Sequence, residues 1–113
     1  MEIFHNPRCS KSRQTLALLD KKGLNPTVKL YLTDIPTSEE LKTILAKLGI
    51  EAEQLVRKGE QVFKEEYKGK ELTEDEWISA MVKHPKLIER PILINKDKAA
   101  IGRPPEKVLD ILD

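Results

Sequence analysis

The sequence is poor in cysteine and in aromatic residues, and it has no surplus of charge of one sign. Cys9 is the only cysteine among 113 residues, and aromatic residues make up 4% of the chain. One cysteine cannot form an internal disulfide, so we expect a protein of the reducing cytosol. The chain has only two histidines beside that cysteine, and their spacing is not typical of a metal site. We therefore expect no bound metal.

The charge balance and the hydropathy exclude two further classes of protein. The chain carries 20 basic and 19 acidic residues, whereas a general nucleic-acid binder is strongly basic. No apolar run approaches the length of a membrane span, and the first residues lack the pattern of a signal peptide. We expect a cytoplasmic protein that binds neither nucleic acid nor membrane. The length suits a single domain, residues 1–113, and nothing suggests an obligate oligomer, so we expect a monomer.

The alternation of apolar and polar residues predicts an α/β protein. Two capping boxes indicate helix starts, Thr37 with Glu40 and Thr73 with Glu76. A strand–helix–strand order at the start favours a parallel βαβ unit, and two short strands near the end favour a hairpin. The predicted order is β-α-β, a helical insertion at about residues 33–88, and β-β-α, all on one mixed sheet. We expect strands at residues 1–5, 27–32, 91–95 and 99–102, helices at residues 10–22, 37–49, 73–84 and 103–112, and one or two short helices around residues 52–56 and 61–66.

Cys9 lies in a basic, turn-forming loop between the first predicted strand and the first predicted helix. A lone cysteine is most often a small buried hydrophobe, but the neighbours Arg8, Lys11 and Arg13 are basic. At a helix start, unpaired N–H groups and the positive end of the helix dipole favour the thiolate, which is the nucleophilic form. The same N–H groups can hold an oxyanion. The loop can therefore supply both a nucleophile and an anion-binding site.

Three further arginines lie where the chain is predicted to turn. Arg57 lies in a charged segment, Arg90 precedes a strand, and Arg103 precedes a helix. Each alone is typical of a solvated surface arginine, but their rigid forks of donors suit a tetrahedral oxyanion. Pro91, directly after Arg90, is a candidate for a cis peptide bond. His5 is either an ordinary strand histidine or a hydrogen-bond partner that orients the Cys9 loop.

Several short motifs are spread over the chain, and each is weak alone. They are His5-Asn6-Pro7-Arg8-Cys9 with Ser12-Arg13, Tyr31-Leu32, Leu55-Val56-Arg57-Lys58, His84-Pro85 with Glu89-Arg90-Pro91-Ile92, and Gly102-Arg103-Pro104. Their combination is specific: the chain resembles the glutaredoxin-coupled arsenate reductase family, the ArsC-like proteins, over nearly its whole length. It looks most like the short reductase-like branch with a Cys-Ser-Lys-Ser-Arg loop.

The resemblance implies a thioredoxin-like fold with a helical insertion between strands two and three, and a cis proline after Arg90. It implies that Cys9 is the nucleophile and that Arg57, Arg90 and Arg103 hold the oxyanion. In the family, the thiolate attacks arsenate, glutathione forms a mixed arsenic adduct, and glutaredoxin with a second glutathione completes the reduction to arsenite. We therefore expect glutathione as co-substrate, glutaredoxin as partner and no bound cofactor. The residues expected to support the loop are His5, Asn6, Ser12, Arg13 and Pro91.

Two features separate the chain from the well-established enzymes of that family. Asp113 directly follows the last predicted helix, where those enzymes carry a C-terminal extension, and the loop reads Cys-Ser-Lys-Ser rather than Cys-Gly-Thr-Ser. Two alternatives therefore stay open. One is a related monothiol oxidoreductase that acts on another oxyanion or on a glutathione mixed disulfide. The other is an Spx-type regulator that binds RNA polymerase, although Ser12 stands where those regulators typically have a second cysteine.

Overall fold

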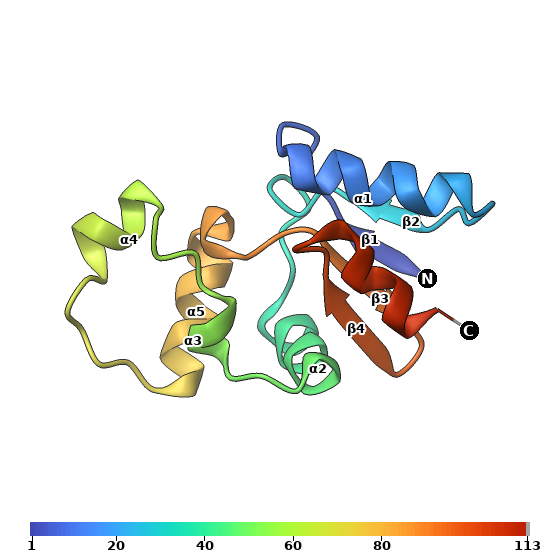
Figure 1. Cartoon of the computed structure of the whole chain (residues 1–113). Coiled ribbons are helices and arrows are strands. Elements are labelled where there is room, and N and C mark those ends of the chain that lie inside the picture. The colour runs from blue at the N-terminus through green and yellow to red at the C-terminus, as the bar shows by residue number, and fades with distance from the viewer. Residues whose placement is uncertain (113) are drawn as a thin grey trace. The chain divides into compact units, whose positions relative to one another are not determined.

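The chain folds as two compact units, one built around a sheet and one built from helices. The computed structural model describes residues 1–112. The sheet unit comprises Met1–Asp34 and the segment from Arg90 onward, and the helical unit comprises Ile35–Glu89. Figure 1 shows the chain coloured from its N-terminus to its C-terminus. The helical insertion expected between the second and third strands is present.

A four-stranded mixed sheet forms the frame of the sheet unit. Its strand order is β2-β1-β3-β4, with β1 and β2 parallel and the other two neighbouring pairs antiparallel. Ile3 pairs with Leu93, and both side chains are fully buried. The parallel βαβ start and the terminal hairpin confirm the predicted order. The strands are β1 (Glu2–Phe4), β2 (Thr27–Lys29), β3 (Ile92–Asn95) and β4 (Lys98–Ile101).

Two helices cover one face of this sheet, as Figure 1 shows. They are α1 (Ser10–Lys21) and the 3-10 helix η2 (Pro105–Ile111). Leu19 of α1 and Val108 of η2 are fully buried and share a core with Ile3 of the sheet. Removal of these apolar side chains from water is the main force that holds α1, and with it the Cys9 loop, on the sheet.

The last helix differs from the prediction in its type and in its start. It is a 3-10 helix that begins at Pro105, not an α-helix from Arg103. The N–H of Lys107 donates to the carbonyl of Pro104, three residues earlier, at 3.0 Å. A residue before a proline is driven out of the helical region, and Pro104 has the extended ψ of 164°. The two adjacent prolines therefore prevent an earlier start.

β2 also differs, because it ends at Lys29, three residues before the predicted end. The carbonyl of Leu30 accepts a hydrogen bond from the N–H of Asp34 at 2.8 Å, so the chain turns here. Tyr31 is fully buried, and its ring stacks on Phe4 with centroids 5.9 Å apart. A turn that buries one aromatic ring has the same apolar and polar pattern as the end of a strand.

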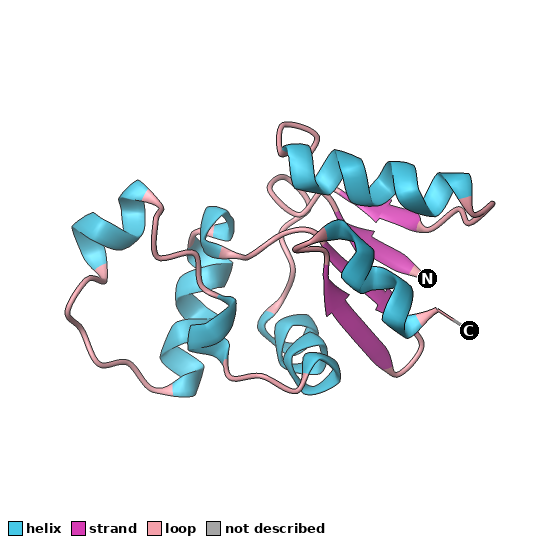
Figure 2. Cartoon of the chain, in the orientation of Figure 1, coloured by secondary structure: helices cyan, strands magenta, loops and turns pink. Residues whose placement is uncertain are grey.

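The helical unit consists of short helices, two of which begin with the predicted capping boxes. The Thr37 hydroxyl accepts from the N–H of Glu40 at 3.1 Å, and the Glu40 carboxylate accepts from the N–H of Thr37 at 3.3 Å. Thr73 and Glu76 pair in the same way. Figure 2 colours the strands of the sheet unit magenta and the helices cyan. The elements are α2 (Ser38–Leu48), α3 (Ala52–Leu55), α4 (Gln61–Glu66), α5 (Glu74–Lys83) and the 3-10 helix η1 (Pro85–Leu87).

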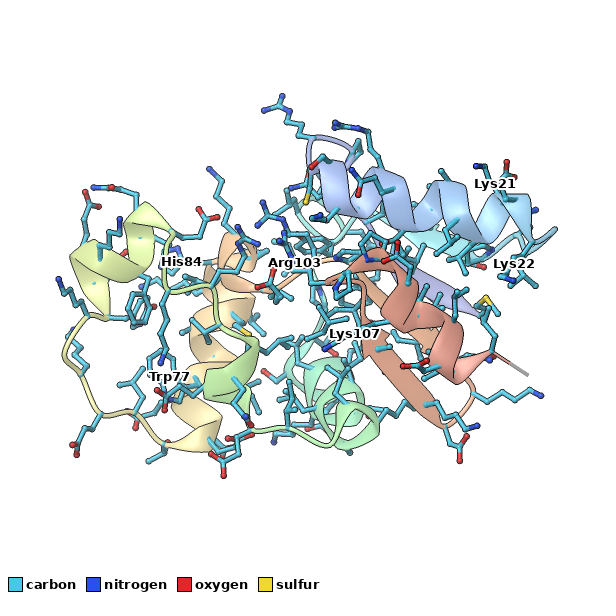
Figure 3. The ribbon with its side chains drawn as sticks, viewed as in Figure 1. Lys21, Lys22, Trp77, His84, Arg103 and Lys107 are labelled. Atoms are coloured by element: carbon cyan, nitrogen blue, oxygen red, sulfur yellow. The ribbon has the colours of Figure 1, made fainter. Side chains whose placement is uncertain are left out.

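Trp77 of α5 is the centre of an aromatic cluster in the helical unit (Figure 3). Its ring stacks on Phe63 with centroids 6.1 Å apart and lies tilted against Tyr67 at 6.2 Å. With 4% of its surface exposed, Trp77 packs as a core residue. Across residues 1–112, no helix has the length and apolar character needed to cross a membrane.

Candidate active site

Cys9 lies at the N-cap of α1, at the end of a loop that is closed by its own hydrogen bonds. The N–H of Cys9 donates to the carbonyl of Asn6 at 3.0 Å, and the Asn6 side-chain oxygen accepts from the N–H of Arg8 at 3.0 Å. Arg13 reaches back from α1 and donates to the carbonyl of Pro7 at 2.9 Å. These bonds hold the loop against the first turn of the helix, so the position of the Cys9 thiol is defined by the backbone.

His5 and Ser12 form a buried pair beneath the loop. His5 Nδ1 and Ser12 Oγ lie 2.6 Å apart, and the N–H of Asn6 also donates to Ser12 Oγ at 3.0 Å. Burial lowers the pKa of the His5 imidazole below its ordinary value of 6.5, and the charge of Arg13 lowers it further. The ring is therefore neutral at pH 7. The structure thus brings His5, Asn6, Ser12 and Arg13 together around the loop; their supporting role stays a prediction.

The pKa of the Cys9 thiol is lowered from its ordinary value of 9.0. Burial alone raises this pKa, because a buried thiolate is poorly solvated. Hydrogen bonds from the N–H of Ser12, from the Arg90 side chain and from the N–H of Lys11, together with the charge of Arg90, outweigh burial. The helix start therefore supplies backbone donors to the sulfur, as the sequence predicts, and the net effect favours the nucleophilic thiolate.

Arg103 and Arg90 both lie at the Cys9 thiol. Arg103 Nη2 donates to Cys9 Sγ at 3.5 Å, and Arg103 Nε donates to the carbonyl of Arg90 at 2.8 Å. Arg103 lies on the segment between β4 and η2, where Figure 3 labels it. The peptide bond between Arg90 and Pro91 is cis, as the resemblance implies. A second cis bond joins Arg103 to Pro104, and no sequence signal distinguished that proline from the others.

Arg57, the third predicted oxyanion ligand, lies in the helical unit. Its Nη1 donates to a carboxylate oxygen of Glu89 at 2.6 Å, and its Nε donates to Glu60 at 3.3 Å. Its N–H also donates to the carbonyl of Leu87 at 2.7 Å. The structure thus brings together Cys9, Arg90 and Arg103 within one unit, whereas Arg57 is held by two carboxylates in the other. Its part in oxyanion binding stays a prediction.

Two residues beside the site, Thr15 and Gly102, had no predicted role. Thr15 of α1 is fully buried, and its hydroxyl donates to the carbonyl of Lys11 at 2.8 Å. The N–H of Gly102 donates to the carbonyl of Pro91 at 2.9 Å. The only sequence signal for a role of these two residues is the glycine that directly precedes Arg103, because a threonine within a helix is not distinctive.

Comparisons with known proteins place the chain among close relatives. The ArsC family model matches residues 4–111. An arsenate reductase of Haemophilus influenzae is 49% identical over 112 residues, which cover 97% of each chain. The uncharacterised protein YfgD of Escherichia coli K12 is 47% identical over 114 residues, which cover 99% of this chain and 96% of that protein.

A solved structure shares both the sequence and the fold. An arsenate reductase from Vibrio cholerae is 48% identical and superposes with a TM-score of 0.95, covering 99% of this chain and 98% of that chain. The predicted fold class, a thioredoxin-like mixed sheet with a helical insertion, is confirmed by this likeness and by the strand order. The match of the family model and the identity to full-length relatives lead to one conclusion: the chain belongs to the ArsC family.

Proposed function

We propose that the protein reduces arsenate to arsenite, with Cys9 as the nucleophile. The observation that carries this proposal is the Cys9 thiol itself, which has a lowered pKa and receives a hydrogen bond from Arg103 Nη2 at 3.5 Å. A thiolate beside cationic forks suits attack on a tetrahedral oxyanion, because the same donors can neutralise the charge of the bound anion. Relatives with 49% and 42% identity that carry the name arsenate reductase support the choice of substrate.

The proposed reaction uses two glutathione molecules and glutaredoxin, all from outside the chain. The Cys9 thiolate displaces one oxygen of arsenate and forms a sulfur–arsenic bond, with that oxygen leaving as hydroxide or water. A glutathione thiol then displaces a second oxygen and gives a mixed arsenic adduct. A glutaredoxin thiolate attacks the sulfur of the arsenic-bound glutathione, so a glutaredoxin–glutathione disulfide forms and the electron pair of the broken sulfur–arsenic bond reduces arsenic(V) to arsenic(III). Water then displaces the Cys9 thiolate from arsenic(III) and releases arsenite, and the second glutathione reduces the mixed disulfide to glutathione disulfide. These donors belong to a reducing cytosol, which stays the predicted compartment.

The arginines have different parts in this proposal. Arg90 and Arg103 hold the oxyanion and stabilise the charge that develops as the thiolate attacks. Arg57 is the third ligand that the family resemblance implies. Its guanidinium is already paired with Glu60 and Glu89, so we assign it a smaller part than the other two. The hydrogen bond between His5 and Ser12 fixes the conformation of the loop.

The test is arsenate-dependent oxidation of NADPH in the presence of glutathione, glutaredoxin and glutathione reductase. We expect turnover with the wild-type protein and none above background with Cys9→Ser. Because Cys9 is the only cysteine, the substitution removes every thiol of the chain and leaves no substitute nucleophile. Turnover of the wild type that is indistinguishable from that of Cys9→Ser would rule out the proposal.

A second candidate is a monothiol oxidoreductase that acts on glutathione mixed disulfides. The lowered pKa of Cys9 favours it equally, because a thiolate attacks a disulfide sulfur in the same way as it attacks arsenic. We expect the two functions to separate in one experiment, in which a glutathionylated peptide replaces arsenate. Release of glutathione from the peptide together with no arsenate turnover selects the second candidate.

A further inference from the structure

Gly102 is packed so closely that no side chain fits at this position. A Cβ atom on Gly102 would lie 2.5 Å from Thr15 Oγ1 and 2.8 Å from Pro91 Cγ. Its backbone is not left-handed, unlike that of Gly23, so conformation does not explain the glycine. The other four glycines have open space where a Cβ would be. Gly102 therefore differs from them in that two neighbouring segments close on it.

The neighbours of Gly102 are the segments that build the thiol site. Thr15 lies on α1, the helix that Cys9 caps, and its hydroxyl is held by the carbonyl of Lys11. Pro91 directly follows Arg90, which contributes to the lowered thiol pKa. Figure 1 shows α1 beside the segment that joins β4 to η2. Close packing at Gly102 therefore brings together α1, Arg90 and Arg103.

Arg103 depends on this packing because it is the next residue. Its guanidinium reaches Cys9 Sγ at 3.5 Å and the carbonyl of Arg90 at 2.8 Å. The sulfur contact is already near the outer limit of a hydrogen bond, so a backbone shift away from α1 lengthens it. Neither the ring atom of Pro91 nor the bonded hydroxyl of Thr15 can move aside freely. An added methyl group must therefore push the Gly102 backbone outward.

We propose that Gly102 is a positioning residue for the thiolate, because its close approach to Thr15 and Pro91 sets the reach of Arg103 to Cys9. The expected effect on the thiol rests on the geometry alone. The expected effect on arsenate turnover rests also on the proposed function. A merely structural glycine would change stability without changing the ionisation of a cysteine that it does not touch.

The test compares Gly102→Ala with Gly59→Ala, which adds the same methyl group in open space. The first readout is the rate of Cys9 alkylation by iodoacetamide as a function of pH, which reports the pKa of the thiol. We expect the pKa of Cys9 in Gly102→Ala to rise toward its ordinary value, and we expect no change in Gly59→Ala. The second readout is kcat/KM for arsenate at pH 7, which we expect to fall about tenfold in Gly102→Ala.

A double variant, Gly102→Ala with Thr15→Ala, removes the shorter of the two contacts. We expect the thiol pKa of the double variant to lie between that of Gly102→Ala and that of Thr15→Ala. If circular dichroism shows that Gly102→Ala does not fold, the double variant is compared with Thr15→Ala instead, and equal thiol pKa values overturn the inference. A pKa in Gly102→Ala equal to that of the wild type, or a double variant no better than Gly102→Ala, overturns the inference. A raised pKa together with a wild type that does not reduce arsenate keeps the inference and rejects the proposed function.

Discussion

Arg103 of the sheet unit and Arg57 of the helical unit are the same residue type in opposite electrostatic surroundings. Arg103 donates to a backbone carbonyl and to the Cys9 sulfur. Arg57 donates to the carboxylates of Glu60 and Glu89. An incoming oxyanion meets a positively charged fork beside a nucleophile in the first case. In the second case it must compete with two carboxylates for the same donors.

The comparison teaches that the surroundings of an arginine, more than its presence in a motif, decide what it can bind. Both arginines stand next to a predicted turn, and both lie in motifs that carry the resemblance to the family. Each arginine has a partner far along the chain, 94 positions away for the Arg103 contact with Cys9 and 32 for the Arg57 contact with Glu89.

Arg103→Ala should have the largest effect on turnover. Loss of one donor to a developing oxyanion lowers kcat by about 10²–10³-fold in comparable sites. The substitution also removes the donor at 3.5 Å from Cys9 Sγ, so the pKa of the thiol should rise. Arg103→Lys is the matched control, because it keeps the charge and loses the planar fork. Steady-state arsenate kinetics and the pH profile of alkylation measure both effects, and an unchanged kcat/KM would remove Arg103 from the site.

Arg57→Ala should have a smaller effect. We expect the KM for arsenate to rise by about tenfold or less, which corresponds to a loss of at most about 1.4 kcal/mol in binding free energy. The reason is that its charge is already paired with two carboxylates. The alkylation profile of Cys9 should not move, because the Arg57 guanidinium donates to the carboxylates of Glu60 and Glu89, whereas that of Arg103 donates to the Cys9 sulfur. A loss of kcat as large as that of Arg103→Ala would break the comparison between the two arginines.

Thr73→Ala should act on the helical unit alone. It removes the N-cap hydroxyl of α5, which accepts a hydrogen bond from the N–H of Glu76, but keeps the backbone N–H that donates to the Glu76 carboxylate. The free energy of unfolding should fall by about 1 kcal/mol. Thr43→Ala is the control, because this exposed threonine lies within α2 and bonds only to the carbonyl of Glu39. Urea unfolding measures the stability. A shifted pH profile of Cys9 alkylation in Thr73→Ala would mean that the two units are coupled at the thiol.

The smallest effect should be a pH dependence of stability that comes from His5. Burial lowers the pKa of His5 below 6.5, so the unfolded chain takes up the proton first as the pH falls. The contribution of the neutral ring to stability is therefore present above pH 6.5 and is lost as the pH falls below it. Urea unfolding at pH 7.5, 6.5 and 5.5 should show a steeper loss for the wild type than for His5→Asn. Equal slopes would show that His5 has an ordinary pKa.

Local signals predicted much of this fold. The capping boxes at Thr37 and Thr73 involve residues three apart, so the sequence contains all the partners, and both are present in the structure. The helix start at Cys9 was predictable for the same reason. The end of β2 was not, because the turn at Leu30 is accompanied by the packing of Tyr31 on Phe4 from a different strand. Long-range packing of this kind has no signature in a short window of residues.

The sequence predicted which residues belong to the candidate site better than it predicted the contacts between them. The motifs identified Cys9 and the arginines, but only the structure shows that Arg103 rather than Arg57 is hydrogen-bonded to the sulfur. The part of Gly102 was also hidden. A glycine in a turn is most simply explained by its backbone freedom, whereas here the reason is the short distance to Thr15 and Pro91. Distances between segments that are far apart in sequence cannot be obtained from either segment alone.

The position of Cys9 at the start of α1 links the charge of the sulfur to the stability of the first helical turn. The backbone N–H groups of Lys11 and Ser12 that favour a negative sulfur are among the unpaired donors at that end of the helix. While the sulfur is ionised, it acts as a counter-charge that holds the first turn in place. When the sulfur is bound to arsenic in the proposed reaction, that counter-charge is gone and α1 begins without it. The first turn of α1 should therefore be more stable before the proposed attack on arsenate than while Cys9 is bound to arsenic.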